Sequence, residues 1–309
     1  SIVFNTIFYI IDCINQQLLL YIILMILNIG LICHGDQKKV GHINFDNYRK
    51  ALKNYFKGSN FTDITNEDQL SEINLLIIVD EHFGPHVDIW KRDSFIEKLN
   101  NVNLKVLLFN IEKIYSSQFP WNVDHQNKVE TINNLIQLFG DIEDRKIKNA
   151  ILNKHGLLSK SQKLKVRNKE KKDSIVFLGQ AEGPQYHRRQ QILNYISSRS
   201  TKVPLEIKVT NRKLTYQEYI ETLAEYKYVL NPLGCGDFIN LRFYEALELG
   251  CIPIQQVTPE MLDLYSRELE YSINFIQPED INLKKEFKKM NYYLEDYFEE
   301  LNLKSILNS

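Results

Sequence analysis

Short apolar runs alternate with amphipathic helical patterns along the 309 residues, and this alternation limits the fold more than any other feature. Strands that alternate with helices form βαβ units and mostly parallel sheets. The sequence therefore predicts an α/β protein with two Rossmann-like domains that face a cleft, followed by C-terminal helices. The apolar runs are NIGLICHG, NLLIIVDEHF and LKVLLFNIE in the first half, and SIVFLG, VPLEIKVT, YVLNP and CIPI in the second.

A cationic segment separates the two series. Residues 160–172, KSQKLKVRNKEKK, carry seven Lys or Arg residues and almost no apolar side chains. This composition is typical of a solvated linker, and its charge offers a second role, attraction of an anionic ligand towards the cleft. We therefore place an N-terminal domain at residues 1–165 and a C-terminal domain at residues 166–309. The chain end, residues 283–307, is expected to form amphipathic helix.

The first residues are apolar and leave two alternatives open. Residues 2–33 contain no Lys or Arg, and their longer apolar run, from Leu18 to Cys33, has 16 residues. A membrane-spanning helix usually needs about 17 to 25 apolar residues, and a signal anchor normally has a basic flank. We favour a buried helix that leads into the first strand. Association of this segment with a membrane is the alternative.

Charge and residue spacing argue against several kinds of site. The formal net charge of -1 gives no overall cationic surface for nucleic acid, so an anionic ligand needs a local group of cations. The four cysteines form no CxxC or Cys/His pattern of a zinc site. A single disulfide bond between two of them is left as an alternative. The nearest acidic cluster, Asp141, Glu143 and Asp144, falls in residues 124–155, which we expect to be helical. We predict no metal and no organic cofactor.

Residues 225–254, EYKYVLNPLGCGDFINLRFYEALELGCIPI, contain the clearest signs of a binding site. After an expected strand, Gly234 and Gly236 let the backbone approach a ligand closely. A helix is then expected to start near Asp237 or Phe238, where free N–H groups favour an anion such as a diphosphate. Asp237 has two open interpretations, as the helix N-cap or as a contact to a sugar.

Arg242 and Glu245 are three residues apart, so they share one face of that helix. A guanidinium binds phosphate through two parallel hydrogen bonds, and a carboxylate accepts ribose hydroxyls. The pair therefore suits a nucleotide sugar, although an ordinary surface ion pair is the alternative. A second candidate segment begins at Gly179, at the end of an expected strand, and continues to Arg188 and Arg189 on the next helix. One of these two arginines is expected to reach the diphosphate.

These features resemble the C-terminal signature of exostosin-type glycosyltransferases, R-x-x-E-A-L-x-x-G-C-I-P-[IV] behind a strand and a glycine-bearing loop. The resemblance covers about 80 residues, 174–254, and is weak or absent in the N-terminal half. It implies a GT-B fold, a nucleotide-diphosphate sugar as co-substrate, an inverting mechanism and no obligatory metal. It also implies that Glu245 holds the ribose and Arg242 the diphosphate. The matched residues are Pro232, Gly234, Arg242, Glu245, Ala246, Leu247, Gly250, Cys251, Ile252 and Pro253.

An inverting transfer also needs a general base for the acceptor hydroxyl. In a GT-B enzyme the base is expected at a strand end of the N-terminal, acceptor-side domain. The segment VDEHFGPH follows the second expected strand and offers Glu81, His82 and His86, and also Asp80. Rival candidates after the first expected strand are His34 and Asp36.

The sequence therefore predicts an inverting glycosyltransferase that transfers a hexosyl or glycuronosyl group, with a UDP-sugar favoured as donor and a glycan or polysaccharide as acceptor. It would work in the cytoplasm or at a membrane, the Golgi membrane in a eukaryote. A catalytically silent subunit that binds a nucleotide sugar is one alternative. A fucosyltransferase-like enzyme that uses a GDP-sugar is the other, disfavoured because the Tyr-Val-Thr-Glu-Lys type of donor motif is missing. Sequence gives no oligomeric state.

Overall fold

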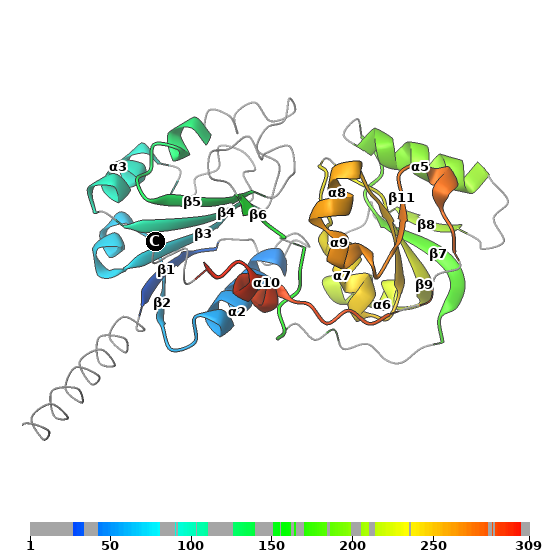
Figure 1. Cartoon of the computed structure of the whole chain (residues 1–309), viewed down its shortest axis with the longest axis horizontal. Helices are drawn as coiled ribbons and strands as arrows, with labels where there is room; N and C mark the ends of the chain where they lie inside the picture. The colour runs from blue at the N-terminus through cyan, green and yellow to red at the C-terminus, as the bar shows by residue number, and fades with distance from the viewer. Residues whose placement is uncertain are drawn as a thin grey trace, which may run out of the picture.

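Two separate parallel sheets, each flanked by helices, make up the chain in this computed structural model (Figure 1). Their strands and helices confirm the predicted fold class, an α/β protein with two Rossmann-like domains. The structure describes residues 27–33, 43–80, 90, 92–102, 104–110, 126–139, 151–154, 156–161, 164, 170–183, 186–198, 205–209, 214–234, 236–283, 286 and 288–303.

The N-terminal sheet has the strand order β2-β1-β3-β4-β5-β6, and every neighbouring pair is parallel. Its central strand β3 is buried along all six residues, as expected for an apolar run covered by helices on both faces. The helices α2, Ile43–Tyr55, and α3, Asp93–Asn101, pack on opposite faces. The strands are β1 Asn28–Ile32, β2 Asn60–Asp63, β3 Leu75–Asp80, β4 Lys105–Asn110, β5 Leu135–Phe139 and β6 Ile151–Leu152.

Two of these strands correct the prediction of helix over residues 124–155. β5 continues the sheet beside β4, with Val106 opposite Leu135, and β6 pairs with the end of β5. Hydrogen-bonded pairing with the buried strand β4 outweighs the local helical preference of these residues. The expected acidic cluster at 141–144 lies outside the described residues. The edge strand β2 was also not predicted, because its polar residues NFTD show no apolar alternation.

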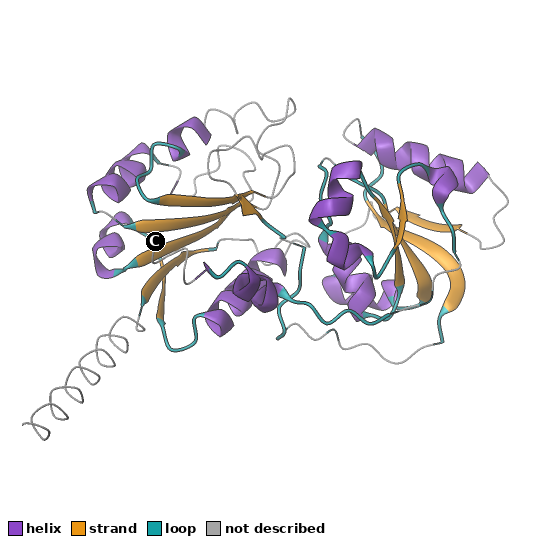
Figure 2. Ribbon diagram, viewed as in Figure 1, coloured by secondary structure: helices purple, strands orange, loops and turns teal. Residues whose placement is uncertain are grey.

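The C-terminal sheet has the order β11-β10-β9-β7-β8 and is again parallel throughout. Helix α5, His187–Ser198, packs on one face, and α6, Tyr216–Leu223, and α7, Leu241–Glu248, pack on the other (Figure 2). Short helices α8, Pro259–Leu264, and α9, Ser266–Leu269, follow β10. The strands are β7 Lys172–Gly179, β8 Leu205–Val209, β9 Tyr226–Asn231, β10 Ile252–Gln256 and β11 Ile273–Phe275.

The strand order reverses direction once in each sheet. In the N-terminal sheet this happens between β1 and β3, and in the C-terminal sheet between β7 and β9. The crossover helices leave the sheet on opposite faces at such a point, so the loops after the two strands diverge. Ligands of open α/β sheets bind there, outside the carboxyl ends of the strands.

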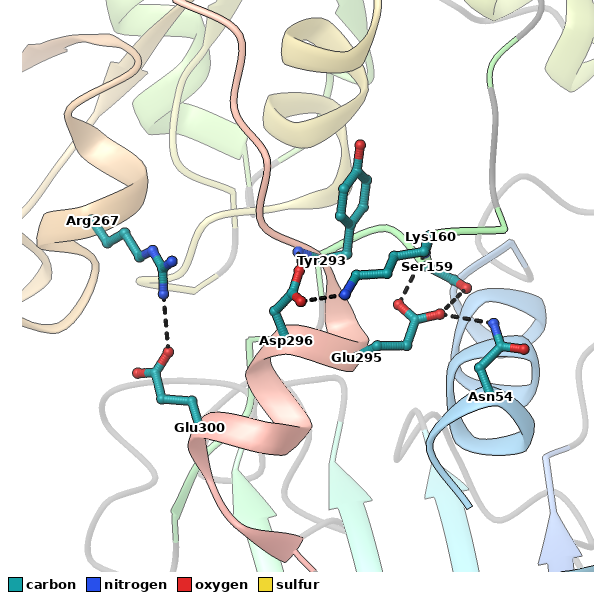
Figure 3. A network of polar contacts seen from close by, with 8 residues as sticks. All are labelled: Asn54, Ser159, Lys160, Arg267, Tyr293, Glu295, Asp296 and Glu300. Carbon is teal, nitrogen blue, oxygen red and sulfur yellow. Dashed lines mark hydrogen bonds and ion pairs between the residues drawn. The ribbon is translucent and has the colours of Figure 1, made fainter. Parts of the chain in front are cut away.

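The last described helix, α10, Leu294–Glu300, packs against α2 of the N-terminal domain. The carboxylate of Glu295 accepts hydrogen bonds from Asn54 Nδ2 at 3.0 Å, Ser159 Oγ at 2.7 Å and the Lys160 backbone N–H at 2.9 Å. Figure 3 shows this network and the ion pair between Arg267 and Glu300. The end of the chain therefore contacts both domains. The expected helix over residues 283–307 begins only at Leu294.

A second contact between the domains lies around Lys154, just after β6. Its ammonium forms a buried ion pair with Glu268 of α9 at 2.9 Å and lies 5.4 to 6.0 Å from three tyrosine ring centres. Gly156 packs against the loop before α7, because a Cβ there would stand 2.7 Å from the Ile239 carbonyl oxygen. The helix that carries Arg242 therefore rests directly on the connection between the domains.

Residues 1–26 lie outside the described residues. Within the part of the chain that the structure describes, no helix is long and apolar enough to cross a membrane. Membrane association through residues 2–33 therefore stays a prediction. Cys33 and Cys251 are buried and free, and the other two cysteines, Cys13 and Cys235, fall outside the description.

Candidate active site

The residues predicted to bind the donor gather at the carboxyl ends of β7 and β9, where the C-terminal strand order reverses. β7 ends at Gly179 and β9 at Asn231. The helices α5 and α7 approach from opposite faces of the sheet. In their first turns, α5 carries Arg188 and Arg189, and α7 carries Arg242. The strand ends and helix starts that carry these residues lie at one edge of the sheet, and their role as a donor site stays a prediction.

Arg242 is the second residue of α7, and its half-buried side chain lies across the end of β7. Its Nη1 donates a hydrogen bond to Asn231 Oδ1 at 3.1 Å, and its Cζ lies 5.2 Å from the Phe177 ring centre. A Cβ on Gly179 would stand only 2.4 Å from Arg242 Nη2. The glycine that ends the strand therefore makes room for the guanidinium.

Arg189 has the same relation to the second glycine of the site. Its side chain is 9% exposed, its Nη1 donates to the Gln180 carbonyl oxygen at 2.8 Å, and its Cζ lies 4.8 Å from the Tyr186 ring centre. A Cβ on Gly234 would stand 2.6 Å from Arg189 Nη2. Of the two glycines expected to allow close approach, Gly234 therefore has the Arg189 guanidinium against it.

Arg188 and Asp237 form an ion pair at 3.1 Å across the same edge of the sheet. The expectation that α7 starts near Asp237 or Phe238 is wrong. The helix begins at Leu241, and its N-cap is Asn240, whose Oδ1 accepts from the Arg242 backbone N–H at 3.1 Å. Asn and Asp both cap helices well, so residue type alone did not separate them. Gly236 precedes Asp237 in the bend between β9 and α7.

Side-chain amides at the ends of β9 and β10, two buried and one half-buried, fix the loop after β9, and sequence reasoning missed them. Asn231 Nδ2 donates to Gln255 Oε1 at 2.5 Å, and Gln256 Oε1 accepts from the Leu233 backbone N–H at 2.9 Å. Asn231 and Gln255 are 0% exposed. In the sequence, β9 and β10 each end in polar amide residues after an apolar run. Such a pattern indicates hydrogen bonding in the interior.

Glu245 lies one turn after Arg242, as predicted, but its carboxylate is 1% exposed. Its Oε1 accepts from the Tyr216 hydroxyl and its Oε2 from the Tyr219 hydroxyl, each at 2.9 Å. Burial raises the pKa of Glu245 to about 7, although the bonds from Tyr216 and Tyr219 and the charge of Arg242 act in the opposite direction. The expected contact with ribose stays a prediction, because tyrosine hydroxyls occupy both oxygens here.

The two tyrosines were not among the predicted site residues. They lie on α6, whose first turn is closed by a capping box between Thr215 and Glu218. Tyr216 and Tyr219 are three residues apart, and their rings stack with centres 6.2 Å apart. Their three-residue spacing places both rings on one face of the helix, and this is the sequence feature that could have identified them.

The N-terminal candidates for the general base fall almost entirely outside the described residues. Those outside are Glu81, His82, His86, His34 and Asp36. Asp80 is the last residue of β3, is 4% exposed and lies opposite Asn110 in the neighbouring strand. The segments after β1 and β3 follow the two strands between which the N-terminal strand order reverses. The identity of the base therefore stays a prediction. In the described ranges, no three or more His, Cys, Asp or Glu side chains are grouped as a metal site.

No family model and no curated protein matches the sequence. Among solved structures, an α1,3-fucosyltransferase matches at 14% identity over 92% of this chain and 90% of its own, with a TM-score of 0.45. The same type of enzyme with GDP-fucose matches at 12% identity, over 92% and 91%, with a TM-score of 0.42. The glycotransferase of kitacinnamycin matches at 8% identity, over 82% and 88%, with a TM-score of 0.33. At this distance, the similarity assigns no role to any residue.

Proposed function

We propose that this chain is a glycosyltransferase that binds a nucleotide-diphosphate sugar at the carboxyl ends of β7 and β9. One observation carries the proposal. Two guanidinium groups, Arg189 and Arg242, come from opposite faces of the C-terminal sheet, and each lies against a glycine at the point where the strand order reverses. We name this group the arginine cradle and define it as Arg189, Arg242, Gly179 and Gly234.

The chemistry of the arginine cradle fits a diphosphate. A guanidinium stays charged at any physiological pH and presents its N–H donors in a planar fork that matches two phosphate oxygens. The known partners of Nη1 on Arg242 and Arg189 are neutral oxygens, the Asn231 amide and the Gln180 carbonyl. A phosphate can replace such a partner with a charge-assisted hydrogen bond, which contributes about 1.5 to 3 kcal/mol.

The same groups suit the transfer step. As the bond between the sugar C1 and the phosphate oxygen breaks, negative charge builds up on the leaving nucleoside diphosphate. Guanidinium groups that are already oriented stabilise this charge without reorganisation. The acceptor hydroxyl attacks C1 and loses its proton to a base, which we place in the N-terminal domain after β1 or β3. An inverting outcome, which the family resemblance implies, is part of this proposal, together with a UDP-sugar as the favoured donor and a glycan or polysaccharide acceptor.

Binding is tested by the thermal stability of the full chain with UDP, GDP and ADP. A nucleoside diphosphate at a hundredfold excess over its Kd stabilises the folded state by about 2.7 kcal/mol, and we expect UDP to give the largest shift. A larger shift with GDP would identify the donor as a GDP-sugar. The variant Arg242→Ala is expected to lose most of the shift.

Arg49→Ala serves as the matched control, since Arg49 pairs with Asp63 in the N-terminal domain, away from the cradle. Its response to nucleotide is expected to equal that of the wild type. If none of the three nucleotides stabilises the wild type, the proposal fails.

Catalysis is tested by the release of nucleoside diphosphate from the matching nucleotide sugar in the presence of a panel of glycan acceptors. Acceptor-dependent release, together with a product of inverted anomeric configuration, is the expected result. Tight binding without release for any acceptor would instead support the catalytically silent subunit.

A further inference from the structure

Two buried side-chain amides connect the arginine cradle to the strands β9 and β10. We propose that Asn231 and Gln255 are positioning residues, which orient the Arg242 guanidinium for the diphosphate without neutralising its charge. Gln255 acts through Asn231, and neither residue contacts the ligand. This inference rests on the proposed function, because it requires that Arg242 binds the diphosphate.

The contacts form an unbroken chain of hydrogen bonds. Arg242 Nη1 donates to Asn231 Oδ1 at 3.1 Å, and Asn231 Nδ2 donates to Gln255 Oε1 at 2.5 Å. Gln255 Nε2 in turn donates to the backbone carbonyl oxygen of Gln256 at 2.5 Å. Asn231 and Gln255 lie opposite each other in the parallel pair of β9 and β10, so the sheet itself brings the two amides together.

The direction of this chain follows from the chemistry of its two ends. A guanidinium only donates hydrogen bonds, so the oxygen of Asn231 has to face Arg242 and its Nδ2 has to face Gln255. A carbonyl oxygen only accepts, so Gln255 turns its Nε2 to Gln256 and its Oε1 to Asn231. Gln255 therefore fixes the orientation in which Asn231 offers an acceptor to the guanidinium.

Burial makes this arrangement costly to disturb. Asn231 and Gln255 are both 0% exposed, so water does not replace a lost partner. Turning either amide over would place two donors or two acceptors face to face in the interior. An arginine side chain has many rotamers, and the affinity of a site rises when the binding rotamer is fixed in advance. The amide chain fixes the Arg242 rotamer in this way at the end of β7.

The neutral charge of the amide is the second part of the argument. A carboxylate in place of Asn231 would hold the guanidinium more tightly, but its negative charge would compete with the diphosphate. The amide oxygen takes one N–H of Nη1, so the other N–H groups of Nη1 and Nη2 can face phosphate oxygens while Asn231 stays in place. The neighbouring cation Arg188 differs, because the carboxylate of Asp237 offsets its charge.

The test measures the affinity of the full chain for two ligands by isothermal titration calorimetry: the nucleoside diphosphate that binds best, and inorganic pyrophosphate, which has no base or ribose. Asn231→Leu removes the acceptor at similar volume and is expected to weaken both ligands by the same factor, roughly tenfold. Gln255→Met removes only the partner that orients Asn231, and it is expected to weaken both ligands equally, by about threefold.

Gln137→Met is the matched control. Gln137 of β5 accepts a hydrogen bond from Gln126 Nε2 at 3.0 Å, and both side chains are buried, so this variant also breaks a buried amide pair. Its stability, measured by urea unfolding without ligand, should fall about as much as that of Gln255→Met. Both ligand affinities should stay within about twofold of the wild type.

Two further variants separate positioning from a merely structural role. Asn231→Asp keeps an acceptor for Arg242 but adds a charge, and it is expected to weaken pyrophosphate roughly threefold more than Asn231→Leu does. In an Arg242→Ala background, Gln255→Met is expected to cause no further loss of affinity, because the positioned group is gone. Gln255→Met supplies the answer if Asn231→Leu does not fold.

Several results would overturn the inference. Unchanged affinities in Asn231→Leu and Gln255→Met, with a strong loss in Arg242→Ala, would show that the amides only stabilise the fold. Normal binding of pyrophosphate to Asn231→Asp would refute the argument from charge. A loss confined to the nucleoside diphosphate would mean that Asn231 contacts the ribose or base.

Failure of the proposed function has a different outcome. If neither ligand binds the wild type, or Arg242→Ala changes neither affinity, the arginine cradle is not the site and the inference falls with it.

Discussion

The two sheets share the same strand order around their reversal points but use glycine differently. In the N-terminal sheet, Gly30 lies inside β1, and a Cβ there would stand 2.4 Å from Ile73 Cδ1 and 2.8 Å from Ile64 Cγ1. In the C-terminal sheet, Gly179 lies at the end of β7, and a Cβ would meet the Arg242 guanidinium. One glycine makes room for core side chains, and the other makes room for the guanidinium that we propose to bind phosphate.

This difference teaches that topology supplies only the location of a site. Both sheets have an edge where loops diverge, and arginines reach both edges. In the N-terminal sheet, Arg49 pairs with Asp63 at the end of β2, whereas in the C-terminal sheet Arg189 and Arg242 lie against glycines. The chemistry comes from the residue types at a few strand and helix ends.

The largest effect is expected at the contact between the domains. Lys154→Met leaves Glu268, which is 0% exposed, without its charge partner, and breaking a buried ion pair in this way costs about 3 to 5 kcal/mol. Urea unfolding of the full chain measures the loss. Lys160→Met is the matched control, since the side chains of its ion pair with Asp296 are 51% and 33% exposed and the pair should contribute at most about 1 kcal/mol. Equal losses in the two variants would refute the importance of the buried pair.

The next effect is a pH dependence that originates in the C-terminal domain. Burial raises the pKa of Glu245 to about 7 in the folded chain, from the ordinary 4.5 of a glutamate side chain. The folded state therefore holds this proton more tightly than the unfolded chain does. Stability contributed by the protonated form is fully present below pH 4.5 and is lost as the pH rises through 7, a change on the order of 3 kcal/mol.

The measurement is the free energy of unfolding of the wild type and of Glu245→Gln at a series of pH values from 4 to about 8. The difference between the two proteins should change with pH in that window and become constant above it. A difference that does not vary with pH would mean that Glu245 ionises normally.

The smallest effect separates the two glycines directly. Gly30→Ala overfills the N-terminal core and should lower stability by about 1 to 3 kcal/mol, with nucleotide affinity unchanged. Gly179→Ala meets the movable end of an arginine, so it should change stability by less than about 1 kcal/mol while displacing the guanidinium and weakening nucleotide affinity roughly tenfold. Chemical unfolding and calorimetric titration of both variants provide the comparison. If Gly179→Ala binds nucleotide as the wild type does, the cradle is not the binding site.

Much of the fold followed from the sequence because its strands are buried on both faces. The run LLIIVD of β3 and the run SIVFLG within β7 are continuous apolar segments of strand length, so local pattern sufficed. β2 and β5 were not predicted because each is stabilised by pairing with a strand far away in the sequence, β1 and β4 respectively. A local sequence pattern does not report such pairing. The helix that ends the chain gave no sign that it packs on α2.

The site was predictable as a set of residue types but not as a set of contacts. Glycines at strand ends and arginines near helix starts pointed to Gly179, Gly234, Arg189 and Arg242, and the structure brings them together. The burial of Glu245 was not foreseeable, because it depends on hydroxyls from α6, more than 20 residues earlier in the chain. Local spacing places Glu245 beside Arg242 but does not say what covers it.

A crystal structure of the full chain with its preferred nucleoside diphosphate would test the central claim most directly. The account predicts diphosphate oxygens within hydrogen-bonding distance of the guanidinium groups of Arg242 and Arg189, at the ends of β7 and β9. A nucleotide bound at the ends of β1 and β3, or one bound elsewhere with both guanidinium groups still on Asn231 and Gln180, would contradict it.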